Sequence, residues 1–331
     1  MTVPARLSYG VLALTLVLTG WLHLGPPLLG VLFSYFVLQQ LLVLTKRKWL
    51  ALVLFVLVAG AIAFGAAYFT RAAIHELPEI ADSSLPSASA WAQARQIELP
   101  FTDFDSLRAF VIDAFKEEAH YLGNVATFAR TATTVLVFVA IGIIAAVSLF
   151  FNSQLDLSHN TQASRNNLYS VFCSEIAVRF RDFYRSFATV MGAQITITLI
   201  NTVLTAIFVL IVRLPNAPLL IAVTFLCGLL PIVGNLVSNT IIVCVAFTVS
   251  LKTAIVALIF LIGIHKLEYF LNSKIVGDRI RNPVWLTLIA LIIGERLMGI
   301  PGMILAPVVL NYLRVEMSAV EVQPGHESRI P

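Results

Sequence analysis

Charged side chains are scarce in this sequence. Lys, Arg, Asp and Glu together make up 12% of the 331 residues, whereas soluble domains carry roughly 25%. Hydrophobic residues account for 59% of the chain. This balance excludes an ordinary soluble protein. It predicts an all-α polytopic membrane protein, because a helix satisfies its own backbone hydrogen bonds inside a bilayer.

The residue patterns of several common site types are also missing. The cysteines Cys173, Cys227 and Cys244 lie far apart, so they provide neither a disulfide framework nor a metal cluster. The sequence contains no His-Glu-x-x-His or Gly-x-Ser-x-Gly motif, no basic nucleic-acid-binding patch, and six scattered histidines. We therefore expect no enzyme, no cofactor, no bound metal and no nucleic-acid partner.

Three apolar runs follow one another at the start of the chain. Leu7–Leu24 and Leu28–Leu44 are separated by Gly25-Pro26-Pro27, and Leu50–Thr70 is the third run. The triplet Lys46-Arg47-Lys48 lies between the second and third runs, and the positive-inside rule places it, together with the N-terminus, in the cytoplasm. Residues 1–70 are thus predicted to form a three-span bundle.

The next segment, 71–130, has a different composition. Nine acidic and three basic residues lie between Glu76 and Glu118. Three crossings from the cytoplasm place this segment outside, so we expect an external acidic helical insert. Thr131–Phe151 then returns as a fourth span, and the arginine-rich segment 152–185 is expected in the cytoplasm as an interfacial helix with an aromatic belt.

The fifth predicted span, Phe187–Val212, carries a polar stripe. Its members recur at i, i+4, i+7, i+8 and i+11, so they share one helix face. One interpretation is interhelical hydrogen bonding, which suits such residues in membranes. The other is the wall of a polar pathway. The stripe consists of Gln194, Thr198, Asn201, Thr202 and Thr205.

Two later apolar segments are interrupted in the middle. In 215–250, the break is Pro231-Ile232-Val233-Gly234-Asn235, and in 283–313 it contains Glu295-Arg296, Gly299, Pro301 and Gly302. In the second segment, the eleven-residue apolar run Val284–Gly294 forms a helix of ~16 Å, about half of a ~30 Å hydrocarbon core. Each segment is therefore either a re-entrant hairpin or a span broken near its centre.

The basic loop 272–282 separates two topologies. Eight transmembrane helices place this loop outside the cell, against the positive-inside rule. Two re-entrant hairpins, at 215–250 and 283–313, on either side of a full span at 251–271 place it in the cytoplasm. The expected fold is therefore six transmembrane helices plus two re-entrant hairpins, with eight transmembrane helices as the alternative.

This topology also predicts the layout of the second half of the chain. Residues 131–314 are expected to form a transport bundle, and 315–331 a cytoplasmic tail, so that both termini are cytoplasmic. Opposed broken helices are a recurring way to build a transporter site, because half-helix ends and unwound backbone can bind a polar solute. The predicted substrate pathway consists of Gln194, Thr198, Asn201, Pro231, Gly234, Asn235, Asn239, Glu295, Arg296, Gly299, Pro301 and Gly302.

The second half of the chain also resembles a known family. Leu230-Pro231-Ile232-Val233-Gly234 looks like the Leu/Ile-Pro-x-x-Gly signature of the autoinducer-2 exporter family of bacterial permeases. Leu267-Glu268 with Lys274-Ile275-Val276-Gly277 and Asn282-Pro283 resembles the next block of that family, although Ser273 stands where proline is common. Gly294 to Pro307 resembles its C-terminal block.

The resemblance implies a homo-oligomeric permease, with a pentamer among the expected forms. It implies export of a small polar molecule such as the quorum-sensing signal autoinducer-2. Sodium–proton exchange, also linked to this family, is the alternative function, with H+ or Na+ as a coupling ion and Glu295 as the titrating group. His265 and Glu268 are candidates to assist Glu295, but we expect these two residues at the cytoplasmic interface instead. Arg296 works against titration of Glu295, because a neighbouring guanidinium favours the ionised carboxylate.

Functions outside secondary transport are further alternatives. An intramembrane enzyme would need a nucleophile with its base or a set of metal ligands, and the sequence has no such motif. A passive channel or scaffold is the other possibility, and saturation of flux would distinguish a carrier from a pore.

The topology generates a labelling prediction. A cysteine introduced by Arg279→Cys, in a variant whose three native cysteines are replaced by serine, should react with a membrane-impermeant maleimide only from the cytoplasmic side. Inside-out vesicles should therefore be labelled and intact cells should not. Labelling of intact cells would contradict the hairpin topology and favour eight crossings.

Overall fold

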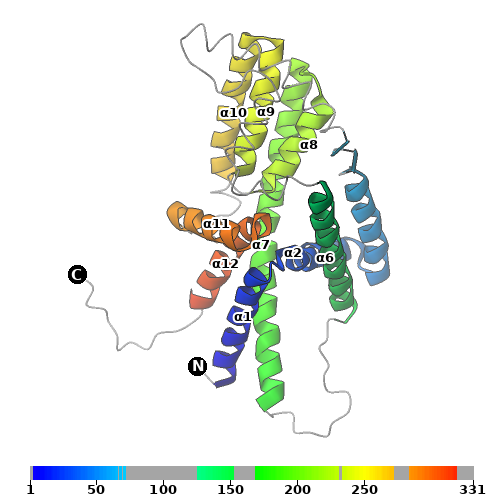
Figure 1. Ribbon diagram of the computed structural model, residues 1–331, viewed down its shortest axis with the longest axis vertical. Helices are drawn as coiled ribbons and strands as arrows, with labels where there is room; N and C mark the ends of the chain where they lie inside the picture. Colours follow the sequence, from blue (N-terminus) through cyan, green and yellow to red (C-terminus); the bar gives the residue numbers. More distant parts are fainter. Residues whose placement is uncertain are drawn as a thin grey trace, which may run out of the picture.

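The computed structural model describes residues 3–65, 67–68, 70–71, 125–152, 168–230, 233–271 and 283–318 (Figure 1). The predicted acidic insert around Glu76–Glu118, the basic loop 272–282, Pro231 and the tail beyond residue 318 lie outside these ranges. All regular elements within the described ranges are α-helices: α1 (Val3–Trp21), α2 (Gly25–Thr45), a helix over Lys48–Gly65, α6 (Val125–Phe151), α7 (Leu168–Val212), α8 (Ala217–Gly228), α9 (Val233–Val249), α10 (Leu251–Leu271), α11 (Val284–Met298) and α12 (Ile300–Ser318).

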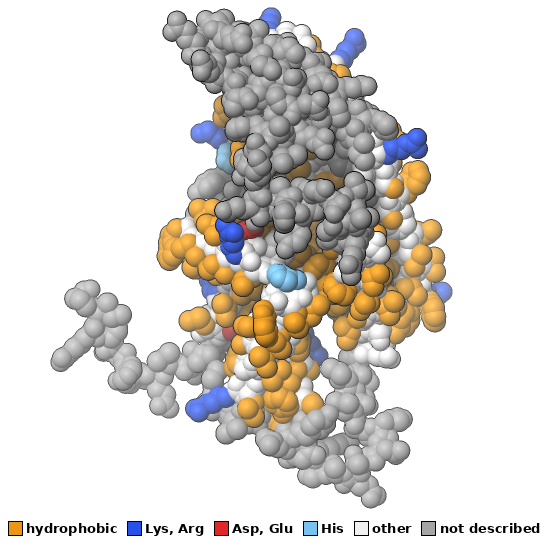
Figure 2. Space-filling model, viewed as in Figure 1, with side chains coloured by type: hydrophobic (Ala, Val, Ile, Leu, Met, Phe, Trp, Pro, Cys, Tyr) orange, Lys and Arg blue, Asp and Glu red, His pale blue; other side chains and the backbone are white. Residues whose placement is uncertain are grey.

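Length and composition allow five of these helices to cross a bilayer. They are Gly25–Thr45, Lys48–Gly65, Thr133–Phe151, Val171–Val212 and Ile300–Ser318. Shorter apolar helices accompany them, among them α8 and α9. Hydrophobic side chains cover much of the described surface visible in Figure 2, as expected of helices that face lipid. The prediction of an all-α polytopic membrane protein is confirmed.

The longest helix differs from the prediction. We expected a span at 187–212 preceded by a separate interfacial helix, but α7 runs without a break from Leu168 to Val212. No glycine or proline lies between Leu168 and Met191, so nothing ends the helix before the apolar part begins. Its 45 residues give a length of ~67 Å, about twice the ~30 Å hydrocarbon core.

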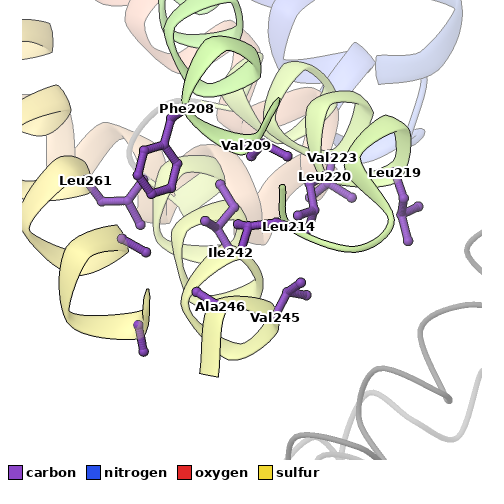
Figure 3. Packing of buried hydrophobic residues seen from close by; sticks show 12 residues of the cluster. Phe208, Val209, Leu214, Leu219, Leu220, Val223, Ile242, Val245, Ala246 and Leu261 are labelled. Atoms are coloured by element: carbon purple, nitrogen blue, oxygen red, sulfur yellow. The ribbon is translucent and has the colours of Figure 1, made fainter. Parts of the chain in front are cut away.

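Helices pack on two successive parts of α7 (Figure 1): α1, α2 and α12 on one part, and α8 and α10 on the next. Around its N-terminal half, Phe183 and Phe187 lie in one apolar core with residues of α1, α2 and α12. Around its C-terminal half, Val209 lies in a second core with Leu220 of α8 and Ile242 of α9 (Figure 3). The fold therefore has two tiers joined by one continuous helix.

Each interrupted segment folds as two helices that pack against each other. We call the C-terminal half of α7 with α8, α9 and α10 the upper tier (top of Figure 1). In this tier, α8 runs back along α7, α9 packs on α8, and α10 packs on α9 and α7. In the second pair, α11 and α12 cross at Gly294 and Gly302, where a Cβ on either glycine would overlap the carbonyl of the other. Only two glycines allow the backbones to approach this closely.

The crossing of α11 and α12 generates a stability prediction. Gly302→Ala should lower the apparent melting temperature of the detergent-solubilised protein by several degrees, because overpacking a close contact costs about 1–3 kcal/mol. Gly263→Ala on α10 is the matched control, since a Cβ there meets nothing within 4 Å. Equal melting temperatures for Gly302→Ala and the control would contradict the packing.

Candidate functional site

The tip of the first hairpin is held by α7. Because α8 ends at Gly228, its last carbonyls have no partner within the helix. The Gly228 carbonyl accepts hydrogen bonds from Gln194 Nε2 and Thr198 Oγ1, each at 2.7 Å. The Cys227 carbonyl accepts the N–H of Leu230 at 2.8 Å. Two predicted site residues therefore close the broken end of α8.

The start of α9 lies directly against the end of α8. A Cβ on Gly234 would overlap the carbonyl of Cys227, so only glycine fits at this position. The signature glycine of the sequence thus has a steric role: it lets the chain reverse within a very short distance.

A carboxylate from a third helix reaches the same tip. Asn235, in the first turn of α9, donates through Nδ2 to both carboxylate oxygens of Glu268 on α10, at 2.6 Å. The Glu268 side chain is 14% exposed, and Nδ1 of His265 lies 3.7 Å from its Oε2. The sequence alone suggested Asn235 as a site residue, but it did not show that Glu268 would meet it.

The polar stripe of α7 faces the protein interior. Thr198, Asn201 and Thr205 are all buried. Within the described part of the chain, Asn201 Oδ1 and Thr202 Oγ1 are buried without a hydrogen-bond partner. Asn239, one turn beyond Asn235 on α9, is half-buried. The stripe therefore combines interhelical hydrogen bonds from Gln194 and Thr198 at the tip with unpaired polar atoms on Asn201 and Thr202, one turn further toward the C-terminus of α7.

The tip of the second hairpin has a different environment. Gly299 adopts a positive φ of 64°, and its N–H donates to the Glu295 carbonyl at 2.7 Å. Glu295 Oε2 lies 3.8 Å from Arg296 Nε, and these side chains are 39% and 76% exposed. Pro301 packs against the start of α2, where a Cβ on Gly25 would lie 2.6 Å from Pro301 Cβ.

The contacts between α12 and α7 define the position of the second tip along the axis of α7. Tyr312 contacts Phe183 with ring centroids 5.6 Å apart, and Glu316 pairs with Arg179 at 2.8 Å. From Tyr312 to Glu316 the α12 chain advances by four residues, whereas its contacts on α7 go back by four residues, from Phe183 to Arg179. The two helices are therefore antiparallel. The same register places Gly302 about level with Gln194. The two tips therefore lie on neighbouring parts of α7, at about the same level along its axis.

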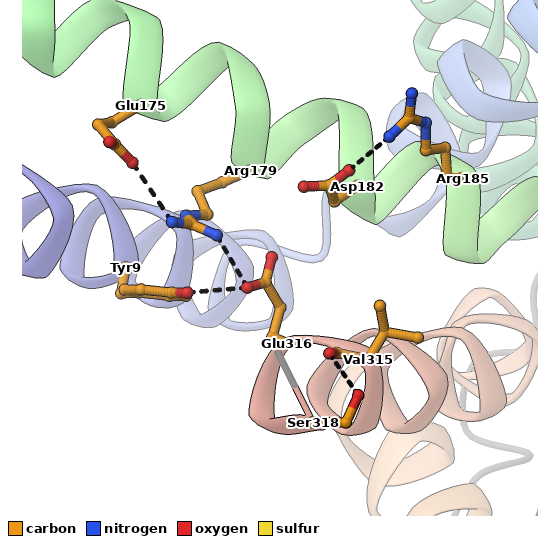
Figure 4. Close-up of polar contacts among 8 residues, drawn as sticks. All are labelled: Tyr9, Glu175, Arg179, Asp182, Arg185, Val315, Glu316 and Ser318. Carbon is orange, nitrogen blue, oxygen red and sulfur yellow. Dashed lines mark hydrogen bonds and ion pairs between the residues drawn. The ribbon is translucent and has the colours of Figure 1, made fainter. Parts of the chain in front are cut away.

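An ionic cluster at the other end of α12 was not foreseen from the sequence. Arg179 Nη1 and Tyr9 OH both donate to Glu316 Oε2 at 2.8 Å, and Arg179 Nη2 lies 3.3 Å from Glu175 Oε2 (Figure 4). The Arg179 guanidinium also stacks over the Tyr9 ring, 4.2 Å from its centroid. This cluster joins the first, the longest and the last described helices.

These observations define a polytopic helical membrane protein with two broken-helix tips beside one long helix. Comparison with known proteins gives the family: residues 11–320 match the AI-2E family transporter, and the chain belongs to this family. It is also 28% identical over 211 residues to the "Putative transport protein YdbI" of Bacillus subtilis (strain 168). That match covers 63% of this chain and 58% of the relative. No solved structure matches the chain.

The family and the relative support the functional class. The chain is similar to transport proteins, as the resemblance in its C-terminal blocks had implied. The match also extends well beyond those blocks, from within α1 to the end of α12.

The closure of α8 generates a second stability prediction. The double variant Gln194→Leu/Thr198→Val removes both donors to Gly228, which leaves a buried carbonyl unpaired at a cost of about 1–3 kcal/mol. It should melt at a lower temperature than the sum of the two single variants indicates, since either donor alone satisfies the carbonyl. The control is Thr196→Val, whose exposed hydroxyl donates only to its own helix at Gly192. Strict additivity would contradict the shared-acceptor geometry.

Proposed function

We propose that this protein is a secondary transporter that exports a small polar solute. The observation that carries the proposal is the placement of both broken-helix tips at about the same level of α7. Half-helix ends carry partial charges, and irregular backbone at membrane depth occurs where it is buried in protein or lines a water-filled cavity. Two such tips beside an inward-facing polar stripe form the proposed solute path.

Helix lengths support a re-entrant first hairpin. α8 has 12 residues and reaches only ~18 Å, which is too short for a ~30 Å core. α12 has 19 residues and reaches ~28 Å, so length alone does not distinguish a hairpin arm from a crossing in the second segment. We propose six transmembrane helices plus two re-entrant hairpins, with eight crossings as the alternative.

The ionic cluster supports the proposed orientation. It brings the start of α1 and the end of α12 together through Tyr9 and Glu316, so both ends of the described chain lie on one side. With Lys46-Arg47-Lys48 at the cytoplasmic face, we propose that both termini are cytoplasmic and that the membrane is the bacterial inner membrane. The division into 1–70, 71–130, 131–314 and 315–331 belongs to the same proposal.

The substrate proposal follows from the family name and the polar character of the path. An autoinducer-2-like signal is the proposed substrate, which would place the protein in quorum sensing, and a homo-oligomer is the proposed assembly. The proposed pathway keeps the residues predicted from the sequence: Gln194, Thr198, Asn201, Pro231, Gly234, Asn235, Asn239, Glu295, Arg296, Gly299, Pro301 and Gly302.

Cation–proton antiport is the second candidate function. It is favoured by the presence of acidic side chains at both tips, Glu268 at the first and Glu295 at the second. Uptake into proteoliposomes distinguishes the two functions. An exporter of a polar solute accumulates that solute, whereas an antiporter accumulates the cation in exchange for protons. Saturation of the initial rate would further exclude a passive pore.

The Glu295–Arg296 pair generates a transport prediction. Glu295→Gln should reduce solute flux several-fold while leaving the amount of folded protein nearly unchanged, because the exposed Arg296 retains access to water. Arg296→Ala should act likewise if the guanidinium binds a hydroxylated or anionic solute. The measurement is initial flux against pH, normalised to folded protein in the membrane.

Two outcomes of this experiment separate the candidates. In antiport through Glu295, Glu295→Gln should abolish the pH dependence of transport, whereas in solute export the residual flux should keep it. Wild-type flux in both variants would show that the pair takes no part in transport.

A further inference from the structure

The upper tier contains a single acidic residue in its described part. From Ser186 to Leu271 the formally charged residues are Arg213, Lys252, Lys266 and Glu268. α10 packs on α9 and on the C-terminal half of α7, and neither contributes a charged side chain; α8, which packs on both of them, contributes none either. Among the described residues of this tier, Glu268 is therefore the one carboxylate, and it lies at the tip of a bundle without other charged side chains in its interior.

The cationic side chains in the described part of this tier are poorly placed to neutralise Glu268. Arg213 lies in the turn between α7 and α8, at the opposite end of the bundle, and Lys252 begins α10 ~24 Å away along the helix axis. Lys266 is exposed, and two residues' separation turns it away from Glu268. His265 is 3.7 Å away, but its side chain is 75% exposed.

A second buried carboxylate provides the contrast. Glu316 is 10% exposed, similar to Glu268, but it is paired with Arg179 at 2.8 Å. Glu268 instead accepts hydrogen bonds from the side-chain amide of Asn235, and His265 Nδ1 lies 3.7 Å from its Oε2. Because a buried carboxylate without a positive partner is costly, it takes up a cation or a proton where one is accessible.

We propose that Glu268 and Asn235 form the binding site for a monovalent cation, H+ or Na+, that drives transport at the first hairpin tip. This inference rests on the proposed transport function. The carboxylate supplies the negative charge, and the Asn235 side chain supplies either an N–H to the empty carboxylate or, after rotation, a carbonyl oxygen to the cation. Cation binding then replaces the Asn235–Glu268 hydrogen bonds by a different contact between α9 and α10, which couples occupancy to the position of the tip.

A carboxyl-directed probe tests the site on the wild-type, full-length protein. N,N′-dicyclohexylcarbodiimide reacts with protonated carboxyl groups in apolar surroundings, and peptide mass spectrometry locates the adduct. We expect labelling of Glu268 in proteoliposomes, several-fold less at alkaline than at acid pH. Loss of labelling when NaCl replaces choline chloride at constant pH identifies Na+ as the ligand, and a response to pH alone identifies H+.

The paired carboxylate Glu316 is the internal control, because Arg179 and Tyr9 both donate hydrogen bonds to it and it should resist the probe. Labelling of Glu268 that is absent at every pH, or that is the same at every pH and NaCl concentration, overturns the proposal. This measurement needs no variant, so misfolding cannot obscure it.

Transport measurements separate this inference from the proposed function. Glu268→Gln should lose flux driven by a cation gradient at least ten-fold, and Glu268→Asp should recover part of it because the carboxylate is retained. Lys266→Gln, which neutralises an exposed charge two residues away, should behave as wild type. Gradient-driven flux that persists in Glu268→Gln overturns the cation site while leaving transport intact. Labelling that responds to cations in a protein without solute flux overturns the proposed exporter function instead.

Discussion

The carbonyl of Gly228 imposes the constraint on which the upper tier depends. A helix that ends inside an apolar bundle exposes carbonyls that water cannot reach, and each must find a donor within the protein. Gln194 and Thr198 supply that donor from α7. The bond fixes the level at which α8 ends, the close approach of Gly234 then fixes the reversal into α9, and Asn235 consequently faces α10.

Local patterns predicted much of this arrangement. Helical spacing predicted that Gln194, Thr198 and Asn201 share a face, and the structure buries Thr198 and Asn201 together. Proline and glycine predicted both interruptions. Spacing could not predict the continuity of α7, because the arginines and aromatic residues before Phe187 suggested an interface although no helix-breaking residue is present. Contacts between distant residues, such as Tyr9 with Glu316 or Asn235 with Glu268, leave no periodic signal.

Two similarly buried glutamates illustrate how surroundings determine the role of a side chain. Glu316 lies between Arg179 and Tyr9 and joins three helices, so its charge is balanced within the fold. Glu268 lies among apolar helices with a neutral amide as its nearest partner. The ion pair of Glu316 is suited to a permanent structural contact. The charge of Glu268 has no such partner in the described fold, so a bound cation or a proton can balance it.

The length of α7 has a mechanical consequence. Both hairpin tips lie near the middle of a ~67 Å rod, so the middle acts as a fulcrum when the rod tilts. A rotation of about 10° would displace points ~27 Å from that fulcrum by about 5 Å and would leave the tips almost where they were. A tilt of α7 would therefore move its two ends in opposite directions around a nearly stationary centre.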